Sequence, residues 1–196
     1  GDDEVVDTGY GVSVSKRLAK RITWGLVAVA IIAFAFLGYE MLSVDSSELT
    51  MSKMDGSWKE LATDDVTIMY QFNKNGEFTE MRTMDDDGTK YGSMCTGTWE
   101  LSQQGILGQC ISMKYDLESL VVDGHNEETG EVYDESDPTV NEMKQTLYAK
   151  YQKENQEVDK YKGTDKVYGL NNLTFSNDTI KQNGISIMVK IGDINR

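Results

Sequence analysis

Histidine, cysteine and proline are nearly absent from this chain of 196 residues. It has one histidine, His125, one proline, Pro138, and two cysteines, Cys95 and Cys110. A single histidine cannot build a histidine-rich zinc site, and a single proline excludes proline-rich linkers. Signatures of a nucleophile elbow, a phosphate-binding loop or a paired catalytic acid are also missing. We therefore predict no metal, no cofactor and no enzymatic activity.

Positive charge is scarce as well. The chain has 19 lysines and arginines against 33 aspartates and glutamates, which gives a formal net charge of -14. The four acidic and four basic residues of 1–21 cancel, so the whole excess lies on 22–196. A surface this acidic repels phosphate backbones and anionic lipid head groups. We therefore expect no nucleic-acid partner.

Charged residues are missing altogether from Ile22 to Tyr39, and the apolar run continues past Glu40 to Leu42. A helix of about 20 residues crosses a hydrocarbon core of about 30 Å. The run is apolar on all sides, unlike the surface helix of a soluble domain. Trp24 and Tyr39 lie near its two ends, where aromatic rings favour the membrane interface. We predict a transmembrane helix over 22–42, in preference to a cleaved signal peptide or a buried core helix.

The residues that flank this run set its orientation. The basic residues Lys16, Arg17, Lys20 and Arg21 precede it, whereas an acidic residue, Glu40, lies near its end. Positive flanks remain in the cytoplasm. We therefore predict that 1–21 is the cytoplasmic tail of an inner-membrane protein and that everything after the helix is periplasmic or extracellular. The spacing of small residues that lets two helices pack closely is absent, so a tight self-dimer of the anchor is not indicated.

The exterior part divides into a short polar stalk over 43–53 and a domain over 54–196. Turn signals recur along the domain at intervals typical of antiparallel β-structure. Asn75-Gly76 supplies the positive φ angles of a tight hairpin, and the segment 77–83 after it alternates with period two. Seven or eight strands are enough to close a small barrel, which has no free edges. The expected fold is mainly β: an antiparallel barrel of about 7–8 strands with one long helix.

That helix is predicted over 138–162. Asp137 is the expected N-cap, Pro138 occupies the first helical position and Gly163 follows the end. Apolar residues recur at spacings of three and four, at Val140, Met143, Leu147 and Tyr151. Such a face covers an end or side of the barrel, or it docks a partner. The pattern allows both interpretations.

The two cysteines lie on strands expected to form one hairpin. In an exported domain a disulfide between Cys95 and Cys110 is one interpretation, and two buried free thiols are the other. The register of the hairpin decides between them. A register that pairs the cysteines sets the two sulfurs side by side. A register in which Cys95 and Ile111 share the inner face points the sulfurs to opposite faces.

Three short motifs occur in order along the domain: Gly56-x-Trp58, then YQFNKNGEF over 70–78, then Gly97-x-Trp99. This series resembles the lipocalin-like domains common in Bacteroidetes envelope proteins, over about two-thirds of the chain. In that family the early Gly-x-Trp lays its ring across the closed end of the barrel. The resemblance implies the same place for Trp58, and an interior that holds a small apolar ligand.

These features predict a membrane-tethered, non-enzymatic binding module in the cell envelope, which engages a protein complex or a small apolar ligand. The alternative is an accessory structural subunit of a larger membrane complex, assembled through its transmembrane helix. Expected partners are membrane lipid, through the anchor, and an envelope or inner-membrane protein. A hollow apolar barrel favours the ligand. A barrel filled by its own side chains favours assembly.

Overall fold

The computed structural model describes residues 5–7, 13–15, 48–61, 63, 65–103, 105–164, 166 and 168–192. The predicted transmembrane segment 22–42 and its basic flank lie outside these residues, and so do Trp24 and Tyr39. Within the described ranges, no helix combines the length and the apolar character needed to cross a membrane. The localisation inferred from the sequence therefore stays a prediction.

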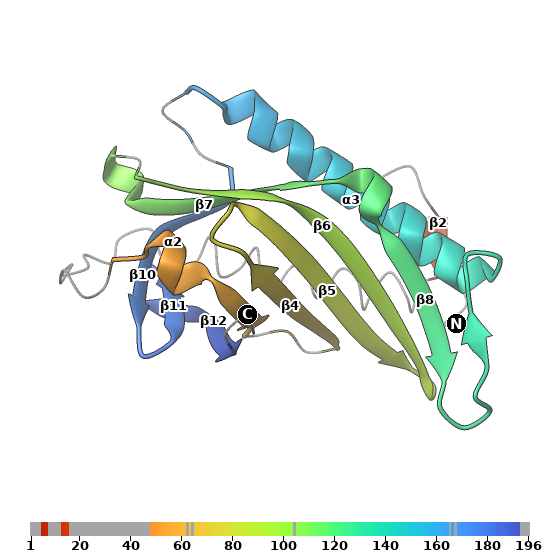
Figure 1. Cartoon of the computed structure of the whole chain (residues 1–196). Coiled ribbons are helices and arrows are strands. Elements are labelled where there is room, and N and C mark those ends of the chain that lie inside the picture. The colour runs from red at the N-terminus through yellow and green to blue at the C-terminus, as the bar shows by residue number, and fades with distance from the viewer. Residues whose placement is uncertain are drawn as a thin grey trace.

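Eight antiparallel strands close into a barrel (Figure 1). Their order around the barrel is β5-β4-β3-β12-β11-β10-β7-β6, and pairing of β6 with β5 completes the circle. The prediction of a mainly β fold with a barrel and one long helix is confirmed. The strands are β3 Gly56–Glu60, β4 Val66–Phe72, β5 Glu77–Asp86, β6 Thr89–Gln103, β7 Gln109–Tyr115, β10 Leu170–Ser176, β11 Thr179–Gln182 and β12 Ile185–Gly192.

Strand β6 is long enough to pair with two different strands along one of its edges. Its second half, 97–103, pairs with β7 inside the barrel. Its first half, 89–94, pairs with β8 (Val121–Asn126), which in turn pairs with the short strand β9 (Val132–Tyr133). The 3-10 turns η2 (Gly105–Leu107) and η3 (Leu117–Ser119) flank β7. Near the N-terminus, β1 (Val5–Asp7) and β2 (Ser13–Ser15) pair in a separate two-stranded sheet.

The period-two pattern of the sequence sets which side chains face inward. In β4, the alternate residues Val66, Ile68, Tyr70 and Phe72 are all buried. The hairpin expected at Asn75-Gly76 forms, but of these two residues only Gly76 has a positive φ, of +93°, and its N–H donates to the Asn73 carbonyl. At the end of this hairpin, Trp99 donates its indole N–H to the same carbonyl at 2.9 Å.

The chain before β3 covers the end of the barrel where β4 finishes. Helix α2 (Met51–Met54) lies there, and the indole N–H of Trp58 donates to the Met54 carbonyl at 2.8 Å. The Gln109 side chain accepts from the Leu49 N–H at 2.6 Å and donates to the Leu49 carbonyl at 2.8 Å. Residues 48–53, expected to belong to a short polar stalk, pack on the barrel, and Leu49 and Met54 are buried in its core.

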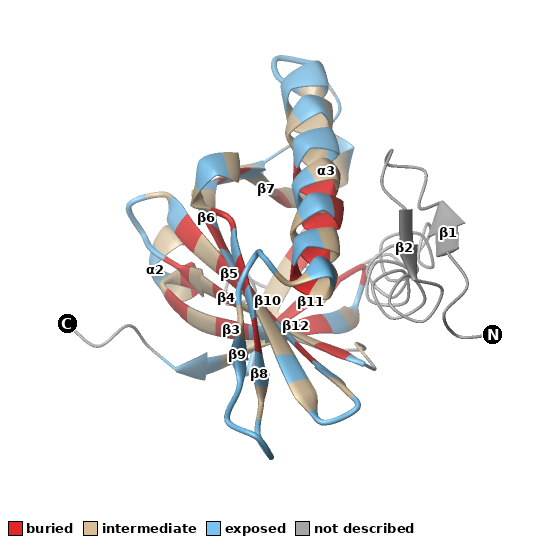
Figure 2. Ribbon diagram, turned by 90° about the vertical axis from the view of Figure 1, so that its right-hand side faces the viewer, coloured by how far each residue is buried: buried red, intermediate tan, exposed pale blue. Residues whose placement is uncertain are grey.

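Helix α3 (Pro138–Tyr161) covers the opposite end (Figure 2). As predicted, the Asp137 side chain caps its first turn by accepting from the N–H groups of Thr139 and Val140, and Pro138 opens the helix. Met143 and Leu147 lie with Val66 and Met84 at the mouth of the barrel. Of the two interpretations of the apolar helix face, the structure shows the one in which it covers the barrel.

Candidate functional site

A charged cluster lies inside the barrel beneath α3. Glu80, Arg82 and Lys150 are only 1%, 8% and 6% exposed. One carboxylate oxygen of Glu80 accepts from the Arg82 Nε at 2.5 Å and from the Tyr151 hydroxyl. The other oxygen accepts from the Tyr115 hydroxyl. Glu80 on β5 therefore joins β7 to α3, because Tyr115 and Tyr151 come from those two elements.

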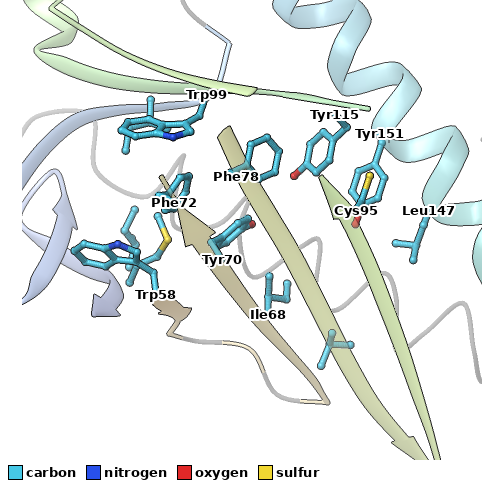
Figure 3. Close-up of a cluster of buried hydrophobic side chains, with 14 of the residues drawn as sticks. Trp58, Ile68, Tyr70, Phe72, Phe78, Cys95, Trp99, Tyr115, Leu147 and Tyr151 are labelled. Carbon is cyan, nitrogen blue, oxygen red and sulfur yellow. The ribbon is translucent and has the colours of Figure 1, made fainter. Parts of the chain in front are cut away.

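The two tyrosine rings are stacked face to face (Figure 3). The ring centroids of Tyr115 and Tyr151 lie 4.1 Å apart with an interplanar angle of 12°. Asn155, one turn further along α3, accepts from the Tyr115 N–H at 2.7 Å and donates to the Tyr115 carbonyl at 2.8 Å. These contacts fix α3 at the end of β7. Tyr115 pairs with Gly97 of β6 on one side, and on the other side Asn155 takes the place of a neighbouring strand.

Two carboxyl groups of the cluster have pKa values shifted in opposite directions. Burial alone raises the pKa of Glu80, but Arg82, Lys150 and the tyrosine hydrogen bonds together lower it to about 2. Burial raises the pKa of Glu60 to about 7, against the smaller lowering effects of Arg82 and Tyr70. Near neutral pH, the Glu80 carboxyl group is therefore ionised, whereas the Glu60 carboxyl group is partly protonated.

Glu60 is the incompletely paired member of the cluster. Its Oε1 accepts from the Tyr70 hydroxyl at 2.9 Å, and its buried Oε2 has no hydrogen-bond partner among the described residues. Two carboxyl groups with separated pKa values are a feature of acid–base catalysts. The nearby cavity between Arg82, Met143 and Leu147, which neither Glu60 nor Glu80 lines, has a volume of about 20 Å³. That volume accommodates about one water molecule, not a substrate.

The remainder of the interior is occupied by buried apolar side chains, many of them the aromatic residues labelled in Figure 3. Phe72 stacks on Tyr70 at 5.5 Å and meets Trp99 edge-on at 5.3 Å, and Phe78 meets Tyr115 edge-on at 5.2 Å. Two larger hollows lie outside the barrel. One, of about 440 Å³, is lined by polar residues of β4, β5 and β6, and the other, of about 240 Å³, lies between β6, β7 and the end of α3.

The residues of the proposed barrel motif are all in the barrel wall. Trp58 and Trp99 are buried, and the Trp58 ring meets Phe175 edge-on at 6.2 Å. The Lys190 ammonium lies 6.0 Å from the centroid of the Trp58 ring. Gly97 is required by space: a Cβ there would lie 2.1 Å from the Lys114 carbonyl oxygen. Gly56 begins β3 with a φ of +142°.

The two cysteines are buried free thiols. The register pairs Leu101 with Ile111, which places Cys95 and Ile111 on the inner face of the β6–β7 pair. Cys110 faces the other way, with its sulfur 3.5 Å from the Gly108 carbonyl oxygen. No disulfide joins Cys95 to Cys110, because the two sulfurs lie on opposite faces. Burial raises the pKa of both thiols, which lowers their reactivity.

The charged cluster was missed from the sequence, although its signal is visible there. In EFTEMRTM (77–84), period two puts Phe78, Glu80, Arg82 and Met84 on one face. Once Phe78 is placed inside, the two charged residues follow it. His125, the single histidine, lies exposed on β8. In the described part of the chain, no three metal-ligating side chains gather closely enough to hold a metal ion.

Comparison of the chain with protein-family models, with curated proteins and with solved structures found no match. The lipocalin-like resemblance of the three motifs therefore remains a proposal. The function therefore has to be inferred from the filled interior of the barrel and from its outer surface.

Proposed function

We propose that this protein is a non-enzymatic module of the cell envelope that engages a protein partner. In this proposal, the run 22–42 anchors the chain in the inner membrane, 1–21 lies in the cytoplasm, and the lipocalin-like barrel lies on the outer side. The barrel is a rigid accessory unit attached to a larger membrane complex. A small apolar ligand is the second candidate.

The filled interior is the observation that favours a protein partner. Tyr70, Phe72, Phe78 and Trp99 occupy the space where a lipocalin-like ligand would lie. Helix α3 closes the end of the barrel, and the cavity of about 20 Å³ beneath it is far below the volume of an apolar ligand. Binding by the barrel therefore has to use its outer surface.

Two measurements test the proposal on the full chain expressed in membranes. Alkaline carbonate should leave the chain in the membrane pellet, and release into the supernatant would contradict the anchor. Native mass spectrometry of the detergent-purified chain should give the mass of the polypeptide alone. A stoichiometric apolar molecule that survives detergent removal would instead support the second candidate.

An anchor exchange separates the barrel from the membrane helix as the assembly element. In this variant, an unrelated apolar helix replaces 22–42, and the complex is recovered by crosslinking in membranes. Retention of the partner would show that the barrel engages it. Loss of the partner would show instead that assembly occurs through the transmembrane helix.

A further inference from the structure

A continuous apolar row crosses the outer face of the barrel. The strand registers pair Met69 with Met81, Met81 with Met94, and Met94 with Val121. These four side chains, here named the methionine row, come from β4, β5, β6 and β8, which lie side by side (Figure 1). Met94 is 45% exposed and Val121 50%, while Met69 and Met81 are half-buried.

The row belongs to the outer surface and not to the core. On β4 and β5, the even-numbered neighbours of Met69 and Met81 point inward and are buried, so the two methionines point outward. Isolated apolar residues are common on protein surfaces. Four that lie directly opposite one another on neighbouring strands form a patch, and exposed apolar patches mark interaction sites. Met69 and Met81 are also not among the half-buried side chains that pack against the hydrophobic core.

Uncharged residues border the row on both sides. One flank is the cross-strand series Thr67, Thr83 and Gly92, and the other is Gln71, Thr79 and Thr96. Carboxylates lie beyond the flanks: Glu77 and Asp116 line the outer hollow of about 440 Å³, and Asp123 is the cross-strand partner of Gly92. The patch is therefore neutral at its centre, and its rim is mainly acidic, with one exposed lysine, Lys59, opposite Met69 at the β3 end.

We propose that the methionine row docks an amphipathic helix of the protein partner, with an apolar face and basic flanks. The proposal rests on the proposed function, whose partner it describes. The apolar face would lie on the four row residues, and the basic flanks would face Glu77, Asp116 and Asp123. The net charge of -14 attracts a basic segment to the molecule from a distance.

The dimensions and the residue type fit a helix. Three strand spacings separate Met69 from Val121, which is about 14 Å. Apolar residues at i, i+4 and i+7 of a helix cover about 10 Å, so two to three turns match the row. Methionine is flexible and polarisable, and exposed methionines adapt to helices of different shape.

The test uses the full chain in phosphatidylcholine nanodiscs and a fluorescent model peptide of about 18 residues, with leucines on one helical face and lysines elsewhere. Fluorescence anisotropy, corrected for empty nanodiscs, should show saturable binding. The double variant Met81→Thr/Met94→Thr should bind about tenfold more weakly or worse. Threonine suits an exposed strand position, so the barrel should stay folded, as near-UV circular dichroism would verify.

Matched controls separate the row from general surface hydrophobicity. Val132→Thr/Ile106→Thr removes two exposed apolar side chains away from the row and should leave binding unchanged. A peptide with the same leucines but glutamates in place of lysines should bind far more weakly, because the rim is acidic. Glu77→Gln/Asp116→Asn should reduce binding of the lysine peptide, most strongly at low salt.

Three results would overturn the proposal. These are equal binding of the glutamate peptide, unchanged binding by the methionine double variant, and a self-dimer of the full chain that the same variant abolishes. The third result would assign the row to a second copy of this chain. Failure here is distinguishable from failure of the proposed function. The anchor exchange and native mass spectrometry report on that function whether or not the peptide binds.

Discussion

At the scale of single residues, the fold depends on one buried carboxylate. Glu80 accepts hydrogen bonds from Arg82, Tyr115 and Tyr151, so it compensates the charge of Arg82 and satisfies two buried hydroxyls. A buried ion pair adds little net stability relative to an apolar pair, because both charges lose their hydration. Removal of one member is costly, since the other charge is left buried and unpaired.

Glu80→Gln should therefore destabilise the protein by about 3–5 kcal/mol, because the buried guanidinium of Arg82 loses its counterion. The free energy of unfolding can be measured by urea titration with tryptophan fluorescence. Glu100→Gln, an exposed carboxylate on β6, is the matched control and should change little. Equal stability of the two variants would contradict the central role of Glu80.

Glu60 should make the stability of the fold depend on pH. Its pKa is about 7 in the folded protein against 4.5 for an ordinary glutamate, so the folded state binds the proton more tightly. The contribution of Glu60 is complete below about pH 4.5 and is lost as the pH rises through 7. Glu80 contributes in the opposite direction at lower pH, because its pKa is lowered.

Glu60→Gln should remove this loss of stability between pH 5 and pH 8. The variant should match the wild-type protein near pH 5 and exceed it at pH 8, as measured by urea titration at both values. A wild-type protein whose stability does not fall across this range, with the variant behaving identically, would show that Glu60 titrates normally.

At the scale of secondary-structure elements, helix α3 and the segment 48–53 cover the two ends of the barrel. Helix α3 was predictable because its cap, its first proline and its apolar spacing are local signals. The end of the barrel that it covers was not predictable, because Asn155 and Tyr151 find their partners on β5 and β7. The packing of 48–53 was missed for the same reason: the contact of Leu49 with Gln109 spans 60 positions.

Asn155→Ala should loosen the end of α3. The substitution leaves the N–H and the carbonyl of Tyr115 without partners, which costs about 1–3 kcal/mol. Hydrogen exchange followed by mass spectrometry should show faster exchange at β7 and along α3 than in the wild-type protein. Asn141→Ala, at an exposed position of the same helix, should leave exchange at β7 unchanged.

Gly97→Ala should disrupt the pairing of β6 with β7. A Cβ at this position meets the Lys114 carbonyl oxygen at 2.1 Å and the Phe78 ring at 2.6 Å, and the backbone oxygen cannot move aside without breaking the ladder. Gly92→Ala on the same strand is milder, since its nearest atom is a side-chain oxygen at 3.2 Å. The thermal unfolding midpoint of Gly97→Ala should therefore lie well below that of Gly92→Ala.

At the scale of the whole molecule, the sequence indicated the architecture better than the function. Period two and the Asn-Gly turn indicated strands and hairpins, because alternation and turns are local properties, and the number of strands then suggested a barrel. The inward direction of Glu80 and Arg82 depends on which face becomes the core, and the methionine row depends on the registers of four strands. The charged pair can be read from β5 alone once its inner face is known, whereas the methionine row is not visible until residues far apart in the chain are aligned.

The whole fold should be insensitive to reducing agents, because Cys95 and Cys110 are buried free thiols on opposite faces. An Ellman assay should detect both thiols in denaturant and react slowly in the native protein. The unfolding midpoint should be the same with and without dithiothreitol. A drop in the midpoint on reduction would mean that the two sulfurs are linked in the isolated protein.

The barrel is joined along a seam between β3 and β12, its first and last strands in chain order. A polypeptide that emerges from a ribosome or a translocon N-terminus first cannot make this seam until its last strand is available. Until then, Trp58 and the adjoining aromatic residues stay accessible to solvent and to chaperones. Assembly should therefore be a late, nearly all-or-none event, and truncation within β12 should abolish it.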